Sequence, residues 1–116
     1  MILAIDCGNT NTVFALYTTN KQIKQLTSWR INNDSKRTAD LYYPWLLKMF
    51  EVSKFDIKSV TGVSVASVVP ETLLNIKSLI NKYLNVKTLI VNDNILKLGI
   101  KVNIENPNEA GADRLV

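Results

Sequence analysis

The 116-residue sequence contains no histidine and a single cysteine, Cys7. The lack of histidine excludes a Ser-His or Cys-His nucleophile pair within these residues and leaves carboxylates or lysines as candidate bases. One cysteine excludes an internal disulfide and a thiolate cluster for zinc. No apolar stretch approaches the ~20 residues of a membrane-spanning helix, and the start of the chain lacks the basic segment of a signal peptide. We therefore expect a cytoplasmic protein with no membrane partner.

The composition is that of a globular domain, with 47% hydrophobic and 21% charged residues. The net charge is +4, which is compatible with an anionic ligand or nucleic acid. The lysines are scattered along the chain rather than clustered, so we expect no nucleic-acid partner. The final residues contain no turn signal, which favours a chain that is part of a longer protein.

Three strands are predicted at the start of the chain. Residues 1–6 form an almost wholly apolar run, which indicates a strand buried on both faces. Residues 12–17 are rich in β-branched and aromatic side chains, and residues 23–31 alternate loosely between apolar and polar. Short polar turns separate the three runs. The domain is therefore predicted to begin as an antiparallel meander.

Helices and further strands are predicted to alternate after residue 32. A helix capped by Ser35 or Thr38 is expected to run to about residue 52, although Pro44 favours either a kink or a start nearer Tyr43. A second helix has Pro70 near its start. Strands are predicted over residues 60–69, 86–91 and 98–104. The order βββαβαβ is that of a ribonuclease H-like α/β fold.

The first motif, CGNTN, joins the first two predicted strands and follows Asp6. A glycine between two strands lets the backbone approach a ligand and expose its N–H groups to an anion. A carboxylate beside a phosphate is explained by a metal ion that bridges the two. The motif therefore indicates a nucleoside triphosphate bound with its cation. An ordinary turn capped by Asp6 is the alternative, and burial of this carboxylate at a strand end favours the ligand.

The second motif is NPNEAGADR, residues 106–114. It places Asp113 beside Arg114, and an arginine can orient a neighbouring carboxylate and lower its pKa. Such a carboxylate can accept the proton of a hydroxyl group. The alternative is a turn followed by a helix whose first residues are acidic.

Four motifs in this order resemble the type III pantothenate kinases: DCGNTNTVFAL, WRINNDSKRTAD, SVASVVP and NPNEAGADRLV. The resemblance covers the whole chain, which corresponds to about the first half of a typical family member. It implies two ribonuclease H-like domains of the acetate kinase, sugar kinase, Hsp70 and actin superfamily. Residues 1–110 would form the N-terminal domain, and residues 111–116 would begin the second.

The resemblance implies ATP-dependent phosphorylation of the pantothenate hydroxyl, the first step of coenzyme A synthesis. Asp113 would be the catalytic proton acceptor. The pantothenate-binding segment would be Gly111, Ala112, Asp113 and Arg114. The ATP phosphates would be bound by Asp6, Cys7, Gly8, Asn9, Thr10, Asn11, Thr12 and Val13. Asp6 would also contact Mg²⁺ indirectly.

The family also implies a monovalent cation, K⁺ or NH₄⁺, whose protein ligand would lie beyond residue 116, and a homodimer of the full-length protein. Ile104 departs from the family, since many members have a tyrosine there that contacts pantothenate. There are two alternatives to a kinase. A non-catalytic accessory relative of the kinases stays open, and a ribonuclease H-like nuclease is disfavoured because residues 64–69 supply no acid.

Overall fold

The computed structural model of the chain describes residues 1–91. The strand predicted over residues 98–104 lies outside the described residues, as does the segment 111–116. Within residues 1–91 the elements follow the predicted order of three strands, a helix, a strand, a helix and a strand.

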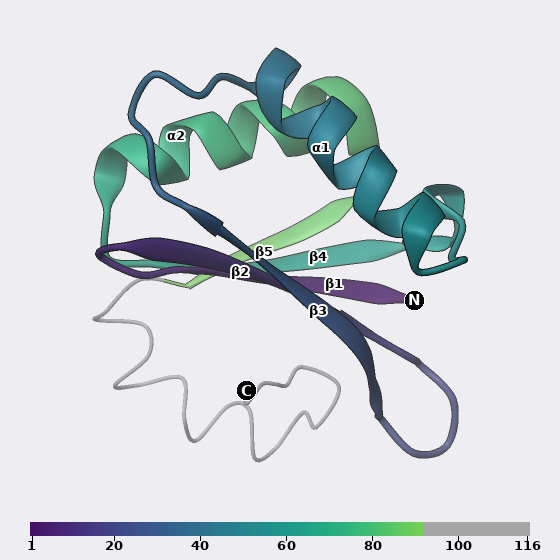
Figure 1. The fold of residues 1–116 in the computed structure, drawn as a ribbon. Helices are drawn as coiled ribbons and strands as arrows, with labels where there is room; N and C mark the ends of the chain where they lie inside the picture. Colours follow the sequence, from purple (N-terminus) through teal and green to yellow (C-terminus); the bar gives the residue numbers. More distant parts are fainter. Residues whose placement is uncertain (92–116) are drawn as a thin grey trace.

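One mixed sheet organises the described residues (Figure 1). Its strands lie side by side in the order β3-β2-β1-β4-β5. The pairs β1–β2 and β2–β3 are antiparallel, and β1–β4 and β4–β5 are parallel. The strands are β1 (Ile2–Cys7), β2 (Asn11–Tyr17), β3 (Gln25–Asn32), β4 (Gly62–Ser67) and β5 (Lys87–Val91). The predicted meander is thus confirmed, and β1 is the central strand.

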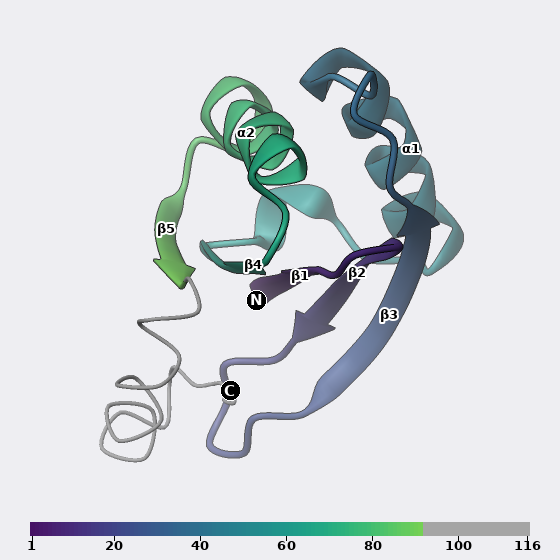
Figure 2. The same cartoon turned by 90° about the vertical axis from the view of Figure 1, so that its left-hand side faces the viewer.

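The helices α1 (Ala39–Val52) and α2 (Pro70–Leu79) cover the same face of the sheet (Figure 2). A short 3₁₀ turn, η1 (Ile57–Ser59), precedes β4, and a π-helical turn, η2 (Ile80–Leu84), extends α2. Pro70 occupies the first turn of α2, where its missing N–H costs no intrahelical hydrogen bond.

Helix α1 begins at Ala39 with Thr38 as its N-cap residue and continues through Pro44. The alternative start near Tyr43 is therefore wrong. Pro44 is exposed, whereas Tyr42 and Leu46 on either side of it are fully buried. Burial of these two large side chains stabilises the helix by an amount comparable to the ~3 kcal/mol that an interior proline costs.

Strand β1 is buried on one face, not on both. Leu3, Ile5 and Cys7 are buried, whereas Ile2 and Ala4 are half-buried and Asp6 is exposed. The prediction of two buried faces is wrong because both described helices pack on the same side of the sheet (Figure 2). We call the other side, which no helix of residues 1–91 covers, the open face.

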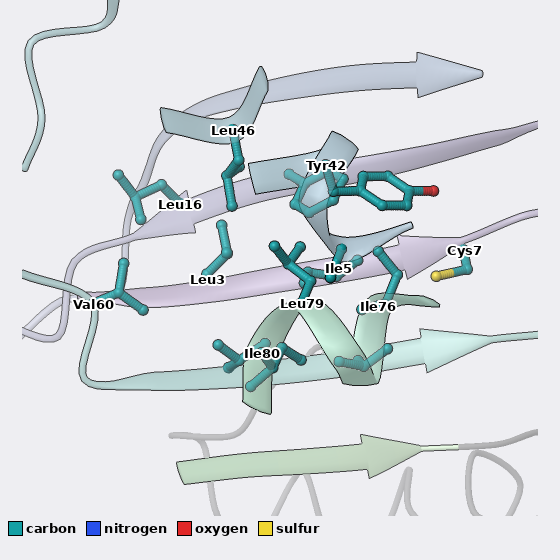
Figure 3. Close-up of a cluster of buried hydrophobic side chains, with 14 of the residues drawn as sticks. Leu3, Ile5, Cys7, Leu16, Tyr42, Leu46, Val60, Ile76, Leu79 and Ile80 are labelled. Carbon is teal, nitrogen blue, oxygen red and sulfur yellow. The ribbon is translucent and has the colours of Figure 1, made fainter. Parts of the chain in front are cut away.

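The core lies between the covered face and the two helices (Figure 3). Side chains of β1 point toward α1 and α2, where Leu46, Ile76 and Leu79 are fully buried against them. Phe14 from β2 packs with its ring centroid 5.3 Å from that of Trp45. The core therefore holds the strands and helices together from one side.

Replacement of Leu46 by alanine should lower the free energy of unfolding by about 2–5 kcal/mol, because it removes fully buried methyl groups and leaves a cavity. Leu47→Ala is the matched control, since its side chain is 42% exposed and its loss should cost under about 1 kcal/mol. Denaturant unfolding of both variants measures the difference. Equal losses would contradict the assignment of the core.

Candidate functional site

The turn between β1 and β2 is closed by one backbone hydrogen bond, which the N–H of Gly8 donates to the carbonyl of Asn11 at 2.9 Å. Gly8 does not have a positive φ. A Cβ atom at this position would lie 3.2 Å from the Asn11 carbonyl oxygen, closer than most Cβ contacts. The glycine is therefore needed for space across the turn. Its N–H is used inside the turn, in contrast to the sequence-based idea that this group is exposed to a ligand.

Two backbone N–H groups of the turn remain available to a ligand. Asn9 and Thr10 are exposed, and neither N–H has an acceptor within residues 1–91. Because backbone N–H groups are strong donors, two of them on an exposed turn can bind an anion without any side-chain charge. These two groups are the best-placed phosphate ligands among the predicted site residues.

Asp6 lies one residue before the end of β1, on the open face. Val13 of β2 and Ala66 of β4 are its partners in the sheet register. Its side chain is exposed and forms no ion pair with another residue of the described chain. The sequence argument from a buried carboxylate is therefore wrong, although Asp6 does lie next to the turn. An exposed carboxylate can contact a hydrated Mg²⁺ through the water of the ion.

Two of the predicted phosphate ligands, Cys7 and Thr12, point into the covered face instead. Both side chains are buried, with 1% and 0% exposure. Burial raises the pKa of the Cys7 thiol. The hydroxyl of Thr12 donates to Asn33 at 2.7 Å. Neither side chain is exposed to a ligand, and the half-buried Val13 has no polar side-chain atom to offer one.

Asn33 is a residue of this site that the sequence did not reveal. It follows β3, and its side chain donates to the Gly8 carbonyl at 2.6 Å and accepts from the Thr12 hydroxyl. Its backbone N–H donates to the Thr10 carbonyl at 2.8 Å. Asparagine is common in loops because it bonds to backbone groups. The sequence offers no signal for this particular pairing, since the partners are separated by more than twenty residues.

The basic residues of the loop between β3 and α1 differ from each other in environment. Arg37 donates to the Asn32 carbonyl and lies 5.6 Å from the centroid of the Tyr42 ring. Lys36 is exposed. Arg37 is half-buried. Its guanidinium stabilises the start of the loop and lies over the Tyr42 ring. Burial raises the pKa of the Tyr42 hydroxyl.

The end of β4 lies beside the end of β1, next to the turn (Figure 1). The N–H of Val68 donates to the Cys7 carbonyl at 3.2 Å. Ser67 exchanges hydrogen bonds with the backbone of Val69, both at 3.0 Å. The hydroxyl of Ser67 thus supports the turn into α2.

Several predicted features lie outside the described residues. These are Gly111, Ala112, Asp113 and Arg114, so the proton acceptor and the substrate segment stay predictions. Within residues 1–91, no three His, Cys, Asp or Glu side chains lie close enough to hold a metal ion. None of the helices in that part of the chain is long and apolar enough to cross a membrane.

The fold and the turn together define a domain of the ribonuclease H-like, actin-like ATPase class. A family profile described as type III pantothenate kinase matches residues 2–116. The chain belongs to the type III pantothenate kinase family, as its motifs predicted.

Curated relatives agree with this assignment. Proteins named type III pantothenate kinase from Caulobacter vibrioides, Phenylobacterium zucineum and Hyphomonas neptunium are 43%, 42% and 41% identical to the chain over all 116 residues. The chain spans 43–44% of the length of these relatives.

Cys7 should resist alkylation in the native protein, because its thiol is buried and its raised pKa keeps it protonated at neutral pH. Iodoacetamide treatment followed by mass spectrometry of the Cys7 peptide measures this. We expect slow labelling in buffer and complete labelling in denaturant. Equally fast labelling in both would show that the end of β1 is open to solvent.

Proposed function

We propose that this chain forms the ATP-phosphate-binding part of a kinase that phosphorylates the hydroxyl of pantothenate and so begins coenzyme A synthesis. The observation that carries the proposal is the exposed turn between β1 and β2 in a member of this family. Two of its N–H groups have no acceptor among residues 1–91, and Asp6 lies beside it. Phosphoryl transfer depends mainly on positioning and charge stabilisation, and outward-facing backbone donors supply both.

In the proposed reaction the pantothenate hydroxyl oxygen forms a bond to the γ-phosphorus of ATP. The bond from that phosphorus to the β–γ bridging oxygen breaks, and ADP leaves. The hydroxyl proton passes to the carboxylate of Asp113. The N–H groups of Asn9 and Thr10 bind the phosphate oxygens, where negative charge is greatest. The segment 111–114 binds pantothenate, and Arg114 orients either the substrate or Asp113.

The described residues fit Mg²⁺ only in part. Asp6 is the acidic side chain of the turn region that faces solvent, so this chain would contact the ion through one carboxylate and its water, while ATP supplies the other oxygens. A bound Mg²⁺ neutralises phosphate charge. The ligand for K⁺ or NH₄⁺ is proposed to lie beyond residue 116, as the resemblance to the family implies.

The remaining proposals concern the whole protein. Residues 1–110 form the first ribonuclease H-like domain, and residues 111–116 begin the second, which supplies the rest of the ATP site. The full-length protein is a homodimer, and its location is the cytoplasm.

The product of the complete gene should release ADP only when both ATP and pantothenate are present, with 4'-phosphopantothenate detected by mass spectrometry. Asp113→Asn should lower kcat by about 10²–10⁴-fold, because it removes the proton acceptor. Glu51→Gln is the matched control. It makes the same acid-to-amide change in an exposed side chain whose ion pair with Lys48 contributes little to stability. A wild-type protein without pantothenate-dependent ADP release would refute the kinase and favour the accessory relative.

The 116-residue fragment alone should not turn over ATP, because it holds only one side of the proposed active site. Coupled measurement of ADP release by the purified fragment tests this expectation. Steady release that needs pantothenate and is lost in Asp113→Asn would show that the second domain is dispensable.

A further inference from the structure

The side chain of Asn33 bonds to the first residue after β1 and to the second residue of β2. Its Nδ2 donates to the Gly8 carbonyl at 2.6 Å, on the β1 side. Its Oδ1 accepts from the Thr12 hydroxyl at 2.7 Å, on the β2 side. Its backbone N–H donates to the Thr10 carbonyl at 2.8 Å. One residue therefore makes three of the hydrogen bonds that hold the turn, and all three come from a loop distant in sequence.

The orientation of the Asn33 amide follows from its partners. A carbonyl oxygen can only accept a hydrogen bond, so the group facing Gly8 must be the NH₂. The amide oxygen then faces Thr12, whose hydroxyl donates to it. Because Asn33 is half-buried and both ends of its amide are bonded, the side chain has one favourable orientation.

This contact fixes the direction of a ligand-binding group. The Gly8 carbonyl and the Asn9 N–H belong to the same planar trans peptide, so they point in opposite directions. When Asn33 binds the Gly8 carbonyl on one side, the Asn9 N–H must face away from Asn33, toward solvent. The bond from Gly8 to Asn11 closes the turn but belongs to the preceding peptide. It leaves the rotation of the peptide between Gly8 and Asn9 undetermined.

We infer that Asn33 is a positioning residue for ATP: it holds the peptide between Gly8 and Asn9 so that the Asn9 N–H faces the phosphates. The inference rests on the proposed kinase function. Asn33 itself faces the inner side of the turn and does not contact the nucleotide. Without its Nδ2, the Gly8 carbonyl loses its partner, and rotation of the peptide would place a carbonyl oxygen where a phosphate binds.

The test compares Asn33→Ala and Asn33→Asp with wild type in the complete gene product. Both variants should raise KM for ATP by roughly 10-fold or more. Each removes the hydrogen bond from Nδ2 and leaves the Gly8 carbonyl without its partner, and the two effects together lower the affinity about tenfold or more. KM for pantothenate should stay within about twofold. Asn33→Ala removes the donor without adding charge, which separates the two effects.

The matched control is Asn32→Asp, which adds the same charge one residue away and keeps the Asn33 donor. Asn32 is exposed, and the hydrogen bond it accepts from Arg37 is made by its backbone carbonyl. Its KM for ATP should change less than about threefold, an electrostatic effect at a solvated site. A rise in KM equal to that of Asn33→Asp, together with an unchanged Asn33→Ala, would overturn the inference.

The outcomes separate this inference from the function beneath it. An inactive wild type refutes the kinase proposal. An active wild type with Asn33 variants that lose kcat alone, at unchanged KM for ATP, shows that Asn33 only stabilises the fold.

If circular dichroism shows that both Asn33 variants are unfolded, Thr12→Val is measured instead, because it keeps the volume and removes the hydroxyl that orients the amide. A KM for ATP raised by roughly threefold would support the inference, and an unchanged KM would overturn it.

Discussion

The structure depends on the pairing of β1 with two different neighbours. It runs antiparallel to β2, to which the short turn connects it, and parallel to β4, which returns after α1. A parallel neighbour ends at the same edge of the sheet as β1, so the start of α2 follows directly beside the turn. The loop after β3 reaches the same edge because β3 is antiparallel to β2. Strand pairing alone therefore brings two segments, far apart in sequence, beside the turn: the loop after β3 and the start of α2 (Figure 1).

The two faces of β1 therefore differ: one packs in the core and the other faces solvent at its end. On the covered face Cys7 continues the core to the end of the strand, and Thr12 opposite it is fully buried. On the open face Asp6 is free to meet solvent. Alternation along a strand is what separates these roles within two consecutive residues. The end of β1 is thus packed into the core through Cys7 on the covered face, while Asp6 on the open face can contact a ligand.

Several features could be predicted from the sequence because they depend on neighbouring residues. Glycine and asparagine marked the turn, and proline marked the start of α2. The family also followed from short motifs. Helix propensity gave the wrong alternative at Pro44, where it favoured a helix start near Tyr43. Propensity does not include the energy gained by burying the neighbouring side chains Tyr42 and Leu46. The prediction that Asp6 is buried was also wrong, because the apolar sequence of a strand does not show whether one or both of its faces are covered.

The sequence by itself determined the order of the elements, the position of the turn and the family, because each is recorded in the types of residues that lie close along the chain. Only the tertiary structure decided which donors of the turn are free. It assigns the Gly8 N–H to Asn11, the Thr12 hydroxyl to Asn33, and leaves the N–H groups of Asn9 and Thr10 without an acceptor in residues 1–91. A hydrogen bond is satisfied in space, by whichever group the fold brings within 3 Å. The partner of the Gly8 carbonyl is therefore an asparagine 25 residues away, for which no local pattern exists.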